Sequence, residues 1–281
     1  MVAEVFLNME ELKSRMNMVF HFASQVSYQN DHLLPVVQAS KSLIGISQDD
    51  PPRNLIKWLE NYMNNFKPDH YYELNKHKVD EIGLLSTFQL EELIMEGKED
   101  GSRKYLDQLI QVSDPRSIME LIFEISLHRS NKEILFCWAA FKTIQFMASN
   151  DRIGILFLCL DCLFSNQVQI TQEEEAVLNF FIHCHSFQIE MTKMVRSKKI
   201  TSILKKRKSK IRKMKVMSNM MPDILKDLLS NNKETALQTY ISNLHINDIT
   251  VDHILLLDAI RAGLKYSKKS DGMLQAFMGL C

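Results

Sequence analysis

The sequence predicts an all-α protein, and three observations support that fold class. Glycine and proline number only eight and six among 281 residues, whereas a sheet-rich fold needs many tight turns. No segment shows sustained alternation of apolar and polar residues, which is the pattern of a half-buried strand. Helix-capping residues recur along the chain at short intervals. These observations predict about 13 helices joined by short loops and packed as an irregular multi-helix bundle.

A short α-solenoid of stacked, HEAT-like helix pairs is the alternative architecture. Such an array shows a fixed repeat length. The closest approach to a repeat is a small residue placed two positions before a lysine or arginine. Its three occurrences, at Ala39, Ala140 and Ala259, are unequally spaced. The bundle is therefore favoured. We expect a single all-helical domain over residues 1–281, with a candidate subdivision near 219–222, because the α conformation is disfavoured for a residue before proline.

The first third of the chain carries signals for five helices. Asn8 and Glu11 have the N-cap and N3 spacing that opens a helix. Ser86 and Gln89 repeat this capping box, and Gly97 has the position of a C′ residue that ends the helix. The helix expected over 70–82 has the weakest pattern. The expected spans are about 8–26, 30–44, 50–63, 70–82 and 86–97.

The middle of the chain has stronger apolar character. Ser102 is expected to open a short helix, and Asp114 before Pro115 combines an N-cap with a proline in the first turn. Two helices, 132–148 and 152–165, are apolar nearly all round and are expected to be buried. The apolar run at 153–164 is about 12 residues, shorter than the roughly 20 that cross a bilayer. The expected spans are 102–112, 115–128, 132–148 and 152–165.

The last part of the chain begins with a capping box at Thr171 and Glu174, which opens a long helix toward the basic stretch described next. Thr250 is the N-cap of a later helix that runs to about Tyr266. The other spans expected after the break are 222–230, 233–243 and 271–279.

The segment 193–215 concentrates positive charge. It holds twelve of the 34 basic residues and no acidic one, while the rest of the chain has a net charge of −12. Wound as a helix, its apolar residues fall within about 100° of one another, which predicts a narrow apolar seam and a broad positive face. The seam residues are Ile200, Ile203, Leu204, Ile211 and Met214, and Arg207 lies in the middle of the same stripe.

Several interpretations of this basic segment remain open. Its lysines can neutralise the phosphates of a nucleic acid, or it can lie on an acidic protein or an anionic membrane, although membrane-surface helices usually add Trp or Phe. The run 205–208 also resembles a nuclear import signal, relevant in a eukaryote. A solvated connector, or a helix paired with the protein's own acidic surface, is the alternative without a partner. The residues expected to bind an anionic partner are Lys198, Lys199, Lys205, Lys206, Lys208, Lys210, Arg212 and Lys213.

The five cysteines indicate a reducing compartment. Their number is odd and four lie in apolar helical patterns, so a disulfide framework is not expected. Together with the lack of a signal peptide, this predicts a cytoplasmic protein, or a nuclear one in a eukaryote. Cys159 and Cys162 form a C-x-x-C motif about 20 residues before His183, Cys184 and His185. The motif lies within a helix and the two histidines point apart, so buried thiols explain it better than zinc.

Two groups of acidic and histidine residues have a spacing that places their members on one helix face. They consist of His70, Glu73 and His77, and of Glu120, Glu124 and His128. Carboxylate and imidazole ligands on facing helices build metal centres in helical bundles. No matching second pair completes such a centre, so solvent-facing acid–base pairs are the favoured explanation and metal binding is the weaker one. No nucleophile motif or glycine-rich phosphate loop is present either.

One stretch resembles a known enzyme family. Residues 28–35 read Tyr-Gln-Asn-Asp-His-Leu-Leu-Pro, Ala39 and Leu43 follow, and 58–62 read Trp-Leu-Glu-Asn-Tyr. This pattern is similar to the opening of the questin oxidase-like family, apart from the inserted Asp31. The resemblance implies an all-helical oxidoreductase that oxygenates polycyclic ketones, with His32 as a candidate catalytic residue. The prediction favoured by the charge distribution is a helical binding protein that engages an anionic partner through 193–215, and the oxidoreductase is the alternative.

Overall fold

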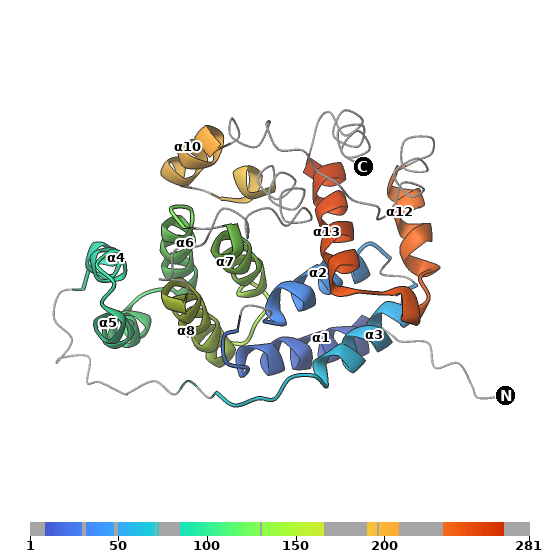
Figure 1. Ribbon diagram of the computed structural model, residues 1–281, viewed down its shortest axis with the longest axis horizontal. Coiled ribbons are helices and arrows are strands. Elements are labelled where there is room, and N and C mark those ends of the chain that lie inside the picture. Colours follow the sequence, from blue (N-terminus) through green and yellow to red (C-terminus); the bar gives the residue numbers. More distant parts are fainter. Residues whose placement is uncertain are drawn as a thin grey trace. The chain divides into compact units, whose positions relative to one another are not determined.

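Every regular element in the described part of the protein is a helix, and no strand occurs there, which confirms the all-α prediction (Figure 1). None of the described helices combines the length and the apolar character that a membrane span requires. The computed structural model describes residues 9–29, 32–47, 50–70, 72, 85–129, 131–165, 190–195, 197–207 and 233–266.

The chain divides into two compact units, each assembled from separate stretches of sequence. The terminal unit consists of residues 1–18, 36–65 and 175–281, and the central unit consists of 19–35 and 66–174. The chain passes between the units within α1 (Met9–Ser24) and within α2 (Leu34–Ile44). The expectation of a single domain over residues 1–281 stays a prediction.

Five helices make up most of the central unit. Within it, α6 packs against α4, α7 and α8, and α8 also packs against α5 and α7. Phe123 of α6 and Trp138 and Phe141 of α7 form an aromatic cluster whose ring centroids lie 5.3 to 5.8 Å apart. The expectation that the helices near 132–148 and 152–165 are buried is confirmed at most of their described positions, although Lys132 and Phe146 are exposed. The helices are α4 (Thr87–Met95), α5 (Glu99–Val112), α6 (Pro115–Ser126), α7 (Asn131–Thr143) and α8 (Ser149–Ser165).

The local signals that bound α4 and α6 are largely confirmed. Ser86 is the N-cap of α4, and its hydroxyl accepts a hydrogen bond of 3.3 Å from the Gln89 amide. Gly97 follows the C-cap with a φ of 74°, a backbone conformation that costs little only without a Cβ. The helix α6 starts at Pro115, although the Asp114 side chain makes no capping bond. Short-range capping chemistry therefore sets these helix ends.

The start of α5 corrects a prediction. This helix begins at Glu99, three residues before the expected Ser102. The Ser102 hydroxyl instead donates 2.8 Å to the Lys98 carbonyl, so it lies inside the first turn and caps nothing. Glu99 and Asp100 occupy that first turn, where negative charge is stabilised by the helix dipole. The helix therefore begins three residues earlier than expected, with two acidic residues in its first turn.

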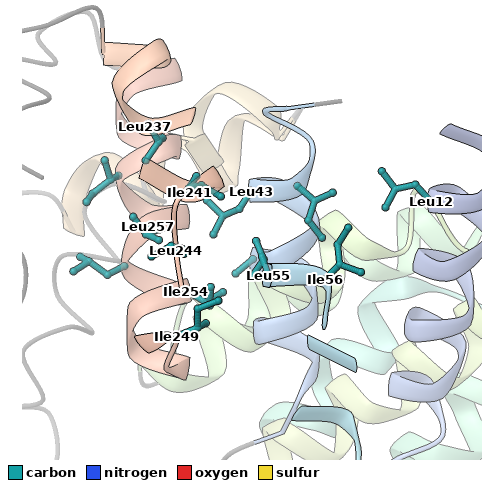
Figure 2. Close-up of a cluster of buried hydrophobic side chains, with 14 residues drawn as sticks. Leu12, Leu43, Leu55, Ile56, Leu237, Ile241, Leu244, Ile249, Ile254 and Leu257 are labelled. Atoms are coloured by element: carbon teal, nitrogen blue, oxygen red, sulfur yellow. The ribbon is translucent and has the colours of Figure 1, made fainter. Parts of the chain in front are cut away.

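Helices from both ends of the sequence share one core in the terminal unit. Figure 2 shows this core, in which Leu43 and Leu55 belong to the first part of the chain and Ile241 and Leu257 to the last. The contributing helices beyond α1 and α2 are α3 (Arg53–Met63), α12 (Lys233–Ser242) and α13 (Val251–Tyr266), and Leu244 and Ile249 add to the core on either side of the exposed 3-10 turn η4 (Ile246–Asp248). The helix α10 (Lys198–Arg207) also belongs to this unit.

Several predicted boundaries in this unit can be compared with the structure. The Thr250 hydroxyl accepts a hydrogen bond of 3.2 Å from the His253 amide and opens α13, as expected. The helix α3 begins at Arg53, because Pro52 and not Asp50 occupies its N-cap. In the central unit, His70 and Tyr72 are not helical, and α7 ends at Thr143 rather than at 148. The helices expected at 222–230 and 271–279, and the one opening at Thr171, lie outside the described residues.

Candidate functional site

The helix α10 is the described part of the basic segment, and a serine sets its start. The Ser197 hydroxyl accepts a hydrogen bond of 3.3 Å from the Ile200 amide, which is the geometry of an N-cap. The Thr201 hydroxyl then donates 3.0 Å to the Ser197 carbonyl. Two hydroxyl groups are therefore used within the first turn, and they anchor a helix whose first turn contains no acidic residue.

The predicted apolar seam is present on the described residues of α10. Ile200 is fully buried and Leu204 is 2% exposed, while Ile203 between them is half-buried. Lys198 and Lys199 are exposed, and so is Lys193 in the helical residues 190–194 that precede α10. The helix is therefore held along one side by apolar contacts and presents lysines on another.

Positive charge is concentrated at the start of α10. Lys198 and Lys199 occupy its first turn, at the positive end of the helix dipole, where cations are destabilising. No carboxylate follows until Asp223, and the nearest preceding one, Glu190, is buried in an ion pair with Arg261. Negative charge brought to this surface relieves the repulsion among the lysines. Lys199 makes an interaction of its own.

Much of the predicted anion-binding set lies beyond the described side chains. The structure gives Lys205, Lys206 and Arg207 as backbone of α10 only. Lys205 lies seven positions after Lys198, and Lys206 lies seven positions after Lys199, so each pair of positions shares a helix face. The remaining members, Lys208, Lys210, Arg212 and Lys213, lie outside the described residues.

His32, the candidate from the enzyme resemblance, has both ring nitrogens engaged by backbone. Its Nε2 lies 2.9 Å from the Val26 carbonyl and donates to it, while Nδ1 accepts 3.0 Å from the Leu34 amide. The ring is 3% exposed and packs edge-on against Phe136. Burial lowers the pKa of His32 to about 4, against the opposing effect of the Val26 carbonyl. A neutral imidazole therefore secures the start of α2, and its catalytic role stays a prediction.

The two acid–histidine sets differ in how many of their residues the structure describes. Among the described residues, no group of three or more His, Cys, Asp or Glu side chains is arranged to hold a metal ion. Glu120 and Glu124 are half-buried on α6 and His128 after it is exposed. His70 stacks on Tyr72, with ring centroids 4.8 Å apart, whereas Glu73 and His77 lie outside the described residues.

The three described cysteines form a buried sulfur cluster in the central unit. Cys137 of α7 and Cys159 and Cys162 of α8 are all free thiols, and the Cys159 thiol lies 3.9 Å from the Met119 sulfur. Burial raises the pKa of all three, which keeps them protonated at neutral pH. They pack as small apolar groups, as the sequence predicted. His183, Cys184 and His185 lie outside the described residues.

Sequence reasoning missed two charged networks. In the central unit, Asp161 accepts a hydrogen bond of 2.6 Å from the Tyr72 phenol and also contacts the Arg103 guanidinium. In the terminal unit, Arg261 pairs with Asp258 at 2.6 Å and with Glu190 at 3.0 Å. Asp161 stands alone in an apolar run, which is the one sequence signal that marked it as an internally paired charge.

Comparison with known proteins adds no relative. No protein-family model, no curated protein and no solved structure matches the chain.

Proposed function

We propose that the protein is a helical binding protein whose basic segment, residues 193–215, engages the phosphate backbone of a nucleic acid. The observation that carries this proposal is the division of α10 into two sides: Ile200 and Leu204 are buried, whereas Lys193 and Lys198 are exposed nearby. Anchoring through the seam leaves the lysines at the start of α10 at the surface.

The buried seam argues against insertion into a lipid surface. An amphipathic helix binds a membrane by placing its apolar side among the acyl chains. On α10 that side is already occupied, since Ile200 is 0% and Leu204 2% exposed. Among the described residues of α10, the exposed lysines are what remains for a partner, and their charge favours a target that carries dense negative charge of its own.

The uniformity of the charge favours a nucleic acid over an acidic protein. The segment places twelve basic residues in 23 positions with no acidic residue among them. A nucleic-acid backbone presents one negative charge at every phosphate, and its neutralisation releases condensed counterions. A protein partner usually mixes charge signs, and an unbroken basic run matches such a surface less well.

Binding to a fluorescein-labelled DNA duplex, followed by anisotropy over a series of salt concentrations, tests the proposal. We expect the logarithm of the association constant to fall linearly with the logarithm of salt concentration, because each phosphate contact releases about one counterion. Reversing Lys205, Lys206, Lys208 and Lys210 to Glu should abolish measurable binding. Anionic and neutral lipid vesicles serve as parallel probes.

The matched control reverses four exposed lysines that lie elsewhere. Lys57, Lys67, Lys104 and Lys132 are exposed in the structure, and their reversal changes the net charge by the same amount. We expect this variant to retain most of its affinity, because long-range charge is screened beyond about 10 Å at moderate salt. Equal loss in both variants would show a nonspecific charge effect. Binding to anionic vesicles but not to DNA would also contradict the proposal.

The oxidoreductase alternative is not proposed, because no feature of the described residues favours it over the binding function. Both ring nitrogens of His32 are engaged by backbone groups, and its resemblance-based role stays a prediction.

A further inference from the structure

Three hydroxyl side chains lie in or next to the first half of α10, and they are not equivalent. The Ser197 hydroxyl caps the helix and the Thr201 hydroxyl donates to the Ser197 carbonyl. The Ser202 side chain is exposed, and its hydroxyl makes no hydrogen bond within the described residues. Ser202 is therefore the exposed hydroxyl of this group, and it is not engaged in a bond within the helix as the half-buried Ser197 and Thr201 are.

Ser202 occupies the centre of the lysine face. Positions three and four before it are Lys199 and Lys198, and positions three and four after it are Lys205 and Lys206. These are the spacings at which helix residues are neighbours on one surface. At 100° per residue, Ser202 points about 160° away from the buried Ile200, on the side opposite the seam. A neutral donor is thus surrounded by four lysine positions.

We infer that Ser202 is a phosphate-contacting residue, whose hydroxyl donates a hydrogen bond to a backbone phosphate oxygen held by the surrounding lysines. The inference rests on the proposed function and names the contact that orients the bound strand. Serine hydroxyls, like lysine and arginine, are common donors to phosphate oxygens in protein–DNA complexes. An ammonium group attracts a phosphate from any direction, whereas a hydroxyl near the helix backbone fixes its position.

The dimensions of the face suit this contact. Lys198 and Lys206 are eight residues apart, which corresponds to about 12 Å along the helix axis. One strand of a duplex rises about 3.4 Å along the duplex axis per phosphate, and adjacent phosphates are farther apart in space because the strand also winds around that axis, so a face of this length spans at least two phosphates. Ser202 lies midway along the face, between the lysine positions at its two ends.

Substitution of Ser202 separates the hydrogen bond from the charges. Ser202→Ala removes the donor without altering charge, and alanine has the higher helix propensity, so the fold should be unaffected. We expect the affinity for the labelled duplex to fall about tenfold, in line with a lost hydrogen bond to a charged group. The slope of log affinity against log salt should be unchanged. Lys198→Ala should instead lower the slope by about 1.

Two further variants act as controls. Ser202→Thr keeps the hydroxyl and should bind within about twofold of the wild type. Thr201→Ala removes a hydroxyl that is already used inside the helix, and it should also leave the affinity within about twofold. Circular dichroism of each variant verifies that helix content is retained.

The possible results distinguish this inference from the proposed function. If Ser202→Ala binds like the wild type while the lysine variants lose affinity, the serine contact is wrong and the nucleic-acid function stands. If Ser202→Ala changes the salt slope by about one contact, the residue acts through the charges, which also overturns the inference. If the wild type shows no salt-dependent binding, both fail.

Discussion

The Asn54 side chain of α3 donates a hydrogen bond of 2.7 Å to the backbone carbonyl of Leu244, which lies 190 residues further along the chain. The same two regions share the core of the terminal unit, where Leu55 and Leu244 are both buried. The bond satisfies a carbonyl that follows the end of α12 and precedes η4. One amide therefore links the third helix of the chain to its last helices.

Replacing Asn54 by Ala should lower the free energy of unfolding by about 1 to 3 kcal/mol, because a partly buried carbonyl loses its donor. Urea denaturation followed by circular dichroism measures the change. Asn65→Ala is the matched control: its exposed side chain bonds only to Tyr62, three residues away, and it should cost less than about 0.5 kcal/mol. Equal losses of unfolding free energy in the two variants would show that the hydrogen bond to Leu244 adds no stability.

Protonation of His32 should make the protein less stable in mild acid. The pKa of His32 is lowered to about 4, so the unfolded chain, with an ordinary value near 6.5, binds the proton first as pH falls. Stability is full above about pH 6.5 and declines toward pH 4, by about 2 kcal/mol at pH 5. Burial lowers the pKa of His253 as well, which acts in the same direction.

Urea denaturation of the wild type and of His32→Asn at pH 7 and pH 5 isolates the contribution of this histidine. The asparagine cannot titrate, so the difference between the two pH values should shrink by most of the 2 kcal/mol expected at about pH 5. An unchanged difference would mean that other groups carry the acid sensitivity. A greater stability of the wild type at pH 5 than at pH 7 would contradict the sign of the shift.

The buried thiols should resist alkylation as long as the central unit is folded. Cys137, Cys159 and Cys162 are fully buried and their raised pKa values leave almost no thiolate at neutral pH. Iodoacetamide labelling followed by peptide mass spectrometry should find these three unmodified in native buffer and fully modified in urea. Rapid native labelling of any of them would show that the cluster opens locally.

Removing Arg261 should be among the most damaging single changes. Burial disfavours the charged guanidinium, but Asp258 and Glu190 outweigh that effect and raise the pKa of Arg261. Their carboxylates are 2% and 3% exposed, so Arg261→Met leaves two buried carboxylates without the cation that they share, at a cost of about 3 to 5 kcal/mol. Thermal unfolding measures the loss.

Arg103→Met is the comparison for this substitution. Its side chain is 32% exposed and one of its partners, Glu99, is half-exposed, so solvent can replace part of the ion pair. We expect a clearly smaller fall in stability than for Arg261→Met. The reverse order would show that exposure does not decide the cost at these two sites.

The elements that the sequence predicted well depend on neighbours in the chain. Ser86, Gly97 and Thr250 mark helix ends through bonds that span only a few residues, so their residue types carry the information. The seam of α10 was likewise visible as a helical period. The start of α5 was missed because a serine within a helix and a serine at its cap look alike in sequence.

The contacts that could not be predicted join distant residues. The bonds from Asn54 to Leu244 and from Tyr72 to Asp161 each depend on how helices pack, which no local pattern encodes. For the candidate site, sequence identified the charge and its seam, but only the structure showed that Ser197 and Thr201 use their hydroxyls internally while Ser202 does not.

The discontinuous core of the terminal unit has a consequence for synthesis of the protein. All residues of the central unit have left the ribosome once position 174 has emerged, so this unit can fold while translation continues. The core around Leu43 and Leu55 lacks its partners until Ile241 and Leu257 are made. A nascent chain stalled before position 233 should therefore protect the helices α6 to α8 from protease while its first helices stay open to cleavage.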